Sequence, residues 1–259
     1  MKRLLALMAG ALISGCFAPS APDASSVLDA GEIRSGTSFL TPETQALQAD
    51  AFANPGFLWV DRGAALFEQP ISDRPACMAC HEAGLKGVAA TYPKIDPESG
   101  QLLNLEGRIN QCRVTHQKAA PLTYESDDLL ALSAYVANQS LGEPIRVDIN
   151  GAAAKHFRQG RDYFTTRRGQ FNLSCQQCHT DHWGQKLRGD TISQGHGNGF
   201  PAYRFEWQSL GSLHRRLRDC DTGVRAQPLP SGDQTYIAVE LFLAARAQGL
   251  DMESPAVRR

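Results

Sequence analysis

The chain has 259 residues, of which 42% are hydrophobic and 20% are charged, and its formal net charge is −1. This composition excludes an intrinsically disordered chain, and without a basic excess it argues against general nucleic-acid binding. The 14 prolines, 23 glycines and 8% aromatic residues indicate a loop-rich chain whose core a bound cofactor would help to fill. The length favours two domains of modest size.

The N-terminus has the pattern of an export signal. Two basic residues precede an apolar run over 4–13, which is too short to span a bilayer. The run is followed by Cys16, and the residues around this cysteine resemble the site where bacterial lipoproteins are cleaved and lipidated. An ordinary signal peptide cleaved near 18–25 is the alternative. We therefore expect a signal peptide over 1–16 and a periplasmic protein, attached to the membrane only if Cys16 is lipidated.

The sequence predicts three segments after the signal. Residues 17–50 are rich in Ala, Pro, Ser and Thr, which indicates a flexible lead-in. Glycine- and proline-containing turns between 141 and 151 read as a linker. We accordingly expect a first domain over 51–148 and a second over 149–259.

Two motifs of the form C-x-x-C-H stand in successive halves of the chain. They comprise Cys77, Cys80 and His81 in the first motif, and Cys175, Cys178 and His179 in the second. Two thiols on one helical turn reach the two vinyl groups of a haem, and the next residue places an imidazole under the iron. A redox dithiol or a zinc site is the alternative. Two such motifs in an exported chain favour two covalently bound haem c groups.

The surroundings of the two motifs repeat. A glycine-containing amphipathic stretch precedes each motif, and a segment with helical spacing, headed by a candidate N-cap, follows it. The stretches before the motifs are 60–67 and 157–164. The helical segments after the motifs are 127–136, preceded by the candidate N-cap Ser126, and 233–243, which begins at the candidate N-cap Asp233. A helix, a haem motif, a loop and a second helix make up a cytochrome c domain. We predict an all-α fold of two tandem cytochrome c-type domains with long loops, each built around a covalently bound haem.

The second axial ligand of each iron has several candidates. Methionine is frequent in electron-carrying c-type cytochromes, but the four methionines lie in the signal, inside a haem motif or near the C-terminus, which nearly excludes it. The remaining candidates are His116, His156, His182, His196, His214, Cys112 and Cys220.

Position in the repeat favours the two cysteines. Cys112 and Cys220 follow their motifs at similar intervals, and each precedes the last helix of its domain. A disulfide between them is the alternative in an oxidising compartment. His182 and His214 are the main rival ligands.

Cys220 lies in a cationic stretch. The arginines around it are Arg215, Arg216, Arg218 and Arg225. Positive neighbours lower the pKa of a thiol and attract oxyanions, although a solvated basic helix face is the alternative. A reactive thiol, a haem and an anion site together favour oxidation at sulfur beside an electron acceptor.

The stretches 192–207 and 211–228 closely resemble the SoxA family, the dihaem subunits of the SoxAX cytochrome of bacterial thiosulfate oxidation. The resemblance extends over 50–259 and is most specific over 175–250. It implies an L-cysteine S-thiosulfotransferase that joins thiosulfate to a cysteine of the SoxYZ carrier and passes two electrons to a cytochrome acceptor. It also implies a heterodimer with a SoxX cytochrome subunit.

The same resemblance implies roles for individual residues. Cys220 would be the catalytic cysteine, carrying a persulfide, beside the active-site haem of the second domain. Arg216 would bind the sulfonate end of thiosulfate, and Arg246 is a second anion-binding candidate. The implied axial ligands are His179 and Cys220 for the active-site haem, and His81 and Cys112 for the haem tethered by Cys77 and Cys80.

The competing function is a dihaem electron-transfer cytochrome with bis-His haems and no substrate site. In that interpretation Cys112 and Cys220 form a disulfide. A dihaem peroxidase is a third interpretation, in which the arginines around Cys220 have no evident use.

Overall fold

The computed structural model describes residue 28 and residues 31–259, so the predicted signal peptide and Cys16 lie outside the described residues. No helix in the described part is long and apolar enough to cross a membrane. The helices are α1 (Pro42–Ala49), α2 (Phe57–Glu68), α3 (Cys77–Cys80), α4 (Leu105–Thr115), α5 (Asp127–Asn138), α6 (Ala154–Thr165), α7 (Cys175–His179), α8 (Leu213–Gly223) and α9 (Gln234–Arg246), with 3-10 helices η1 (Gly36–Phe39), η2 (Ala89–Thr91) and η3 (Gly151–Ala153).

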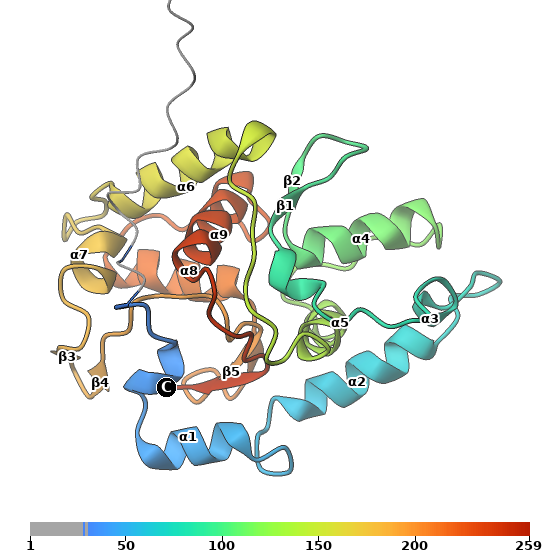
Figure 1. The fold of residues 1–259 in the computed structure, drawn as a ribbon, viewed down its shortest axis with the longest axis horizontal. Helices are drawn as coiled ribbons and strands as arrows, with labels where there is room; N and C mark the ends of the chain where they lie inside the picture. The colour runs from blue at the N-terminus through green and yellow to red at the C-terminus, as the bar shows by residue number, and fades with distance from the viewer. Residues whose placement is uncertain (1–27, 29–30) are drawn as a thin grey trace, which may run out of the picture.

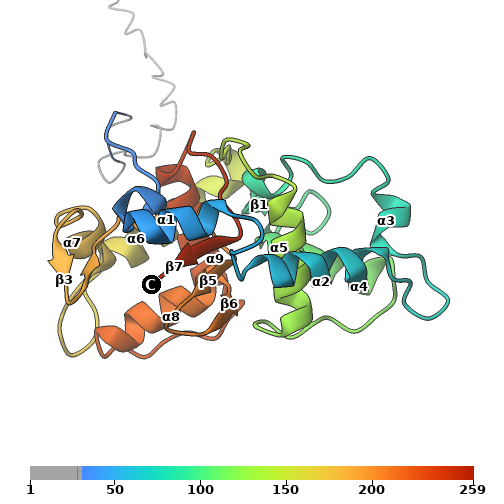
Figure 2. The same cartoon turned by 90° about the horizontal axis from the view of Figure 1, so that it is seen from below.

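The helices form two similar groups. Figures 1 and 2 show α2, α4 and α5 on one side of the molecule and α6, α8 and α9 on the other. The four helical segments predicted around the motifs lie within α2, α5, α6 and α9. Both predicted N-caps are confirmed, because Ser126 accepts a hydrogen bond from the backbone N–H of Leu129 and Asp233 accepts one from that of Thr235.

A glycine lies where the helices of each group cross. A Cβ on Gly63 of α2 would be 2.1 Å from the backbone oxygen of Ala131 in α5. A Cβ on Gly160 of α6 would be 2.0 Å from the backbone oxygen of Ala238 in α9. Only glycine permits so close an approach of two backbones. The repeat inferred from the sequence is therefore present in the packing of both helix pairs.

We expect Gly160→Ala to lower the free energy of unfolding by about 2 kcal/mol, because α6 and α9 must separate to admit the methyl group. Gly223, at the end of α8, has nothing within 4 Å of its Cβ position. Gly223→Ala is therefore the control, with an expected change of about 0.5 kcal/mol or less. Urea unfolding of the haem-loaded protein measures both variants, and equal effects would contradict the close crossing.

Apolar clusters extend across the predicted boundary between 148 and 149. One cluster centres on Phe157, Phe164 and Phe242 but includes Leu102 from the first half. The other two draw about equally on both halves. They contain Ala89, Ala90, Ala137, Ile145, Ala244, Ala247 and Met252 in one, and Val60, Leu130, Ala134, Tyr203, Leu210 and Val257 in the other. The two groups of helices thus share their cores.

The prediction of an all-α fold is wrong in one respect, because the second half contains a three-stranded sheet. β5 (Ala202–Arg204) pairs antiparallel with β6 (Ser209–Gly211) and parallel with β7 (Ala256–Arg258). The remaining strands form two short hairpins, β1 (Lys94–Ile95) with β2 (Leu102–Leu103) and β3 (Lys186–Leu187) with β4 (Asp190–Thr191). Strands this short carry too few residues for an alternating pattern to reveal them.

The prediction of a flexible lead-in over 17–50 is wrong for the part that the structure describes. Residues 36–49 form η1 and α1, and Thr41 caps α1 by accepting a hydrogen bond from the backbone N–H of Thr44. Figure 2 shows α1 lying beside β7, with which it is in contact. Composition could not reveal this order, because the partners of the segment lie at the opposite end of the chain.

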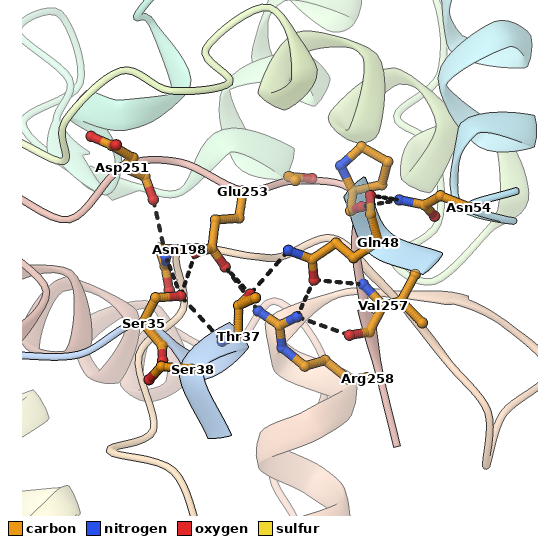
Figure 3. Close-up of polar contacts among 12 residues, drawn as sticks. Ser35, Thr37, Ser38, Gln48, Asn54, Asn198, Asp251, Glu253, Val257 and Arg258 are labelled. Atoms are coloured by element: carbon orange, nitrogen blue, oxygen red, sulfur yellow. Dashed lines mark hydrogen bonds and ion pairs between the residues drawn. The ribbon is translucent and has the colours of Figure 1, made fainter. Parts of the chain in front are cut away.

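A polar cluster joins this segment to the C-terminus (Figure 3). Glu253 accepts hydrogen bonds from Thr37 Oγ1 at 2.6 Å and Arg258 Nη2 at 3.1 Å. Ser35 Oγ also donates to Glu253, and Gln48 Nε2 donates to Thr37 Oγ1 at 3.0 Å. We call residues 31–41 the N-terminal strap. It is an ordered part of the second half of the molecule.

Candidate functional site

Each C-x-x-C-H motif forms a short helix, α3 or α7. Figures 1 and 2 place α3 and α7 at opposite ends of the molecule. Ser174 begins α7 with a capping box, in which its backbone N–H donates to Gln177 Oε1 at 2.9 Å. The six described cysteines are all free thiols. Two separate sites are therefore built from equivalent parts of the repeat.

Cys112 and Cys220 occupy the same position on two equivalent helices. α4 and α8 each have 11 residues, and each begins at a polar side chain that caps it, Asn104 in α4 and Ser212 in α8. The predicted layout has a loop between each motif and the last helix, with a basic helix face as the alternative around Cys220; the structure has a helix at both places. The cysteines are half-buried near the end of each helix.

In the first site Cys112 lies near both cysteines of its motif. Burial raises the pKa of Cys112, and the charge of Cys80 raises it further. Burial also raises the pKa of Cys77, and Cys112 adds to that increase. The third member of the motif, His81, has its ring 6.1 Å from the ring of Phe67.

The second site has the same arrangement of three thiols. Burial raises the pKa of Cys175 to about 11, and the charge of Cys220 contributes to the increase. Burial and then Cys220 raise the pKa of Cys178 as well. Because Cys112 and Cys220 are free thiols in separate sites, the disulfide alternative does not apply.

His179 is held in the form that binds a metal. Its Nδ1 lies 2.7 Å from the carbonyl oxygen of Ser193, so Nδ1 carries the proton and Nε2 is left to ligate. Burial lowers the pKa of His179 to about 4, with smaller contributions from the charges of Arg216 and Arg246. A Cβ on Gly195 would lie 2.9 Å from His179 Cγ, so the adjoining loop packs directly against the ring.

These residues fit a covalently bound haem. Each site offers two thiols on one turn, an imidazole next to them and a third thiol from another helix, which matches the attachment and axial ligands of a c-type haem. Among residues 31–259, no three His, Cys, Asp or Glu side chains converge in the way that a bound metal ion requires.

Arg108 and Arg216 occupy equivalent positions, one helical turn before Cys112 and Cys220, but their surroundings differ. Arg108 Nη1 donates to Asp96 Oδ1 at 3.2 Å and to Gln111 Oε1 at 2.6 Å. The Arg216 guanidinium has no hydrogen-bond or ion-pair partner among the described residues. The charge of Glu206 interacts with Arg216 without such a direct contact. A guanidinium near a thiol whose N–H groups have no protein acceptor can bind an anion, and only the second site has one at this position.

Arg246, the other predicted anion-binding residue, lies at the same site. It is fully buried, and its Nη2 donates to the backbone oxygen of His179 at 3.3 Å. The guanidinium carbon is 4.8 Å from the centre of the Phe164 ring. Burial lowers the pKa of Arg246 to about 10, which leaves it charged at neutral pH. The structure thus brings Arg216 and Arg246 together around the second motif.

Arg204 is a charged residue of the site that was not among the candidates predicted from the sequence. It is 6% exposed, its Nη2 donates to Glu206 at 2.7 Å, and its buried Nε has no hydrogen-bond partner. Burial and the charge of Arg216 lower the pKa of Arg204, while the charge of Cys220 raises it. Arg216 and Cys220 are therefore both close to Arg204. Arg204 lies within the stretch 192–207, but only the pairing of β5 with β6 brings it close to α8.

The main rival ligands are engaged elsewhere. His214 is fully buried, accepts a hydrogen bond from the backbone N–H of Gly232 at 2.8 Å and stacks on Tyr124 with ring centres 5.8 Å apart. His182 is exposed, and its Nδ1 lies 2.5 Å from the backbone oxygen of Gln177. His214 is therefore a core residue, and the histidines do not reproduce the symmetry that the cysteines show.

Comparisons with known proteins show relatives over most of the chain. A family model described as SoxA/TsdA, cytochrome c domain, matches residues 62–145. The L-cysteine S-thiosulfotransferase subunits SoxA of Rhodovulum sulfidophilum and Pseudaminobacter salicylatoxidans are each 38% identical, over 88% and 87% of this chain and 80% of theirs. The crystal structure of SoxXA from P. pantotrophus aligns with a TM-score of 0.83 and 32% identity, covering 88% of this chain and 87% of that chain.

Proposed function

The chain belongs to the SoxA family of L-cysteine S-thiosulfotransferase subunits, and on this basis we propose which of its residues carry the reaction. It is a c-type cytochrome subunit, with covalently bound haem c, that conjugates thiosulfate to a protein cysteine. The proposal assigns two haems, tethered by Cys77 and Cys80 and by Cys175 and Cys178. His81 and Cys112 would ligate the iron in the first site, and His179 and Cys220 would ligate it in the second.

The reaction forms one sulfur–sulfur bond and releases two electrons. A cysteine thiolate of the SoxYZ carrier and thiosulfate together carry three negative charges, and their conjugate carries one, so two electrons pass to a cytochrome acceptor. A haem, when bound, supplies a one-electron acceptor, so a second centre in a partner cytochrome subunit must share the two electrons. In the proposal Cys220 is the catalytic cysteine and carries sulfur as a persulfide.

The observation that carries this assignment is the contrast between Arg216 and Arg108. Asp96 and Gln111 accept hydrogen bonds from Arg108, whereas the Arg216 guanidinium makes no hydrogen bond or ion pair with a described side chain and has the charge of Glu206 in its surroundings. The doubly negative thiosulfate ion needs such a guanidinium to approach a thiolate, because two anions repel each other. This contrast supports the second site as the catalytic one, and the proposal gives the first haem a structural role.

The partners and location follow from the same proposal. The SoxXA structure from P. pantotrophus supports a SoxX subunit as the partner in a heterodimer. The enzyme name supports SoxYZ as the carrier and thiosulfate as the substrate. The basic and apolar pattern over 1–16 supports export to the periplasm, and mass spectrometry of the mature N-terminus tests whether Cys16 carries a lipid.

We expect Arg216→Ala to raise the KM for thiosulfate by a factor of about 10 to 100, because a charge-assisted hydrogen bond contributes about 1.5 to 3 kcal/mol. The absorption spectra of the haems should change little. Arg225, which is exposed and lies 4.9 Å from the centre of the Phe171 ring, provides the control, and Arg225→Ala should leave the KM within twofold. The assay varies thiosulfate in the presence of SoxX and SoxYZ. A large spectral change with an unaltered KM would refute the substrate role.

A further inference from the structure

The loop 193–198 packs against His179. Gln194, near the start of this loop, bonds it to the N-terminal strap. This side chain is fully buried. Its Oε1 accepts a hydrogen bond from the backbone N–H of Arg34 at 2.7 Å, and its Nε2 donates to the backbone oxygen of Glu32 at 2.8 Å. A single amide therefore satisfies a backbone donor and a backbone acceptor of the strap.

Asn198 ties the other end of the loop to the strap. It is 1% exposed, and its Nδ2 lies 3.3 Å from Ser35 Oγ and 3.0 Å from the backbone oxygen of Asp251 (Figure 3). Ser35 in turn donates to Glu253, which the C-terminal polar cluster holds in place. The strap thus fixes the loop at two points, four residues apart.

The strap also contacts the chain just after His179. The Arg34 guanidinium carbon lies 5.5 Å from the centre of the Trp183 ring, and the ring of Phe39 meets Trp183 edge-on at 6.1 Å. The two segments at Trp183 and at Gln194, which both follow His179 in the chain, are therefore held by the same short piece of chain.

The atoms that contact the His179 ring lie next to these anchors. Ser193, which precedes Gln194, supplies the carbonyl oxygen that accepts the Nδ1 hydrogen, and Gly195, which follows it, packs against the ring. A displacement of Gln194 would move both contacts. The orientation and basicity of an axial imidazole depend on the partner of its second nitrogen.

We propose that the N-terminal strap positions the axial ligand His179, and that Gln194 is the positioning residue through which it acts. This inference rests on the proposed ligation of a haem iron by His179. It assigns a function to residues 31–41, for which the sequence predicted only a flexible lead-in.

The test compares Gln194→Met with Gln194→Ala in the full-length, haem-loaded protein bound to its SoxX partner. Methionine preserves most of the volume of glutamine and removes both hydrogen bonds to the strap, together with the contact of Gln194 Oε1 with His196 Nε2 at 3.1 Å, so it separates loss of these polar contacts from cavity formation. Gln117, which is 7% exposed and donates to the backbone oxygen of Pro75 at 3.0 Å beside the first motif, provides the matched control as Gln117→Met.

Low-temperature electron paramagnetic resonance is the main measurement. We expect Gln194→Met to shift the largest g value of the haem signal that depends on Cys220, with the other haem signal unchanged, and Gln117→Met to leave the Cys220-dependent signal in place. Hydrogen exchange at the Arg34 amide should become about five to ten times faster, since that amide loses its acceptor. The kcat should fall while the KM for thiosulfate stays within twofold.

The outcomes separate this inference from the proposed function. If haem is attached to Cys175 and Cys178 but the signal in Gln194→Met equals that of the unsubstituted protein, the positioning role is wrong. An equal shift of both haem signals would indicate general loosening and would also overturn it. If the unsubstituted protein carries no haem at the second motif, it is the proposed function that fails.

Discussion

Cys220→Ala is expected to abolish thiosulfate conjugation, lowering kcat by a factor of about 1,000 or more, as removal of a reacting side chain commonly does. Among the described cysteines, Cys220 is the one near both Cys175 and Cys178 that does not belong to their motif. It also lies one helical turn after Arg216, the proposed thiosulfate-binding residue. No other described thiol can take its place at this site.

The measurement combines turnover, in the presence of SoxX, SoxYZ and thiosulfate, with low-temperature electron paramagnetic resonance of the oxidised protein. One low-spin signal typical of thiolate-ligated haem should disappear from Cys220→Ala. Cys112→Ala, at the equivalent position of the first site, is the comparison; it should remove the other signal and lower kcat by about tenfold or less. Full activity of Cys220→Ala would refute the catalytic role, and bis-His signals in both variants would refute thiolate ligation.

Asp221→Ala is expected to lower the free energy of unfolding by about 3 to 5 kcal/mol, because it removes one partner of a buried ion pair. Asp221 is 3% exposed. Its Oδ2 accepts hydrogen bonds from the hydroxyls of Tyr163 and Tyr236, each at 2.6 Å, and its Oδ1 accepts one from Arg168 Nη1 at 3.3 Å. Alanine would leave three donors and one positive charge without their acceptor.

The same network holds α8 against the second motif. Asp221 follows Cys220 in α8, Tyr163 belongs to α6 and Tyr236 to α9. Arg168 Nη1 also lies 3.6 Å from Cys175 Sγ. We therefore expect loss of Asp221 to weaken haem retention at the second site as well as global stability.

Tyr163→Phe is the matched control for Asp221→Ala, since it removes one hydroxyl and leaves the ion pair with Arg168 in place. It should lower the free energy of unfolding by about 1 kcal/mol. Urea unfolding followed by circular dichroism measures stability, and the absorbance ratio of haem to protein measures retention. A change below about 1 kcal/mol in Asp221→Ala, or equal changes in both variants, would contradict a central role for the carboxylate.

Features that depend on neighbouring residues are predictable from the amino-acid sequence by itself. The C-x-x-C-H motifs are one case, because the attachment of a haem needs two thiols and an imidazole at fixed local spacing. The helices α2, α5, α6 and α9 are another, because apolar periodicity and an N-cap are properties of a dozen consecutive residues. The repeat then placed Cys112 and Cys220 in equivalent positions, and the structure puts them on equivalent helices.

Features that depend on distant residues emerged only from the folded chain. Arg108 and Arg216 look alike in sequence, yet Asp96 pairs with the first, while the second makes no hydrogen bond or ion pair with a described side chain. Arg204 reaches the site through the pairing of β5 with β6, and the strap is ordered by Glu253 and Gln194. Local patterns specify the haem sites because covalent attachment is local. The anion site and the support of His179 depend on charges and hydrogen bonds between segments far apart in the chain, and only the fold brings these together.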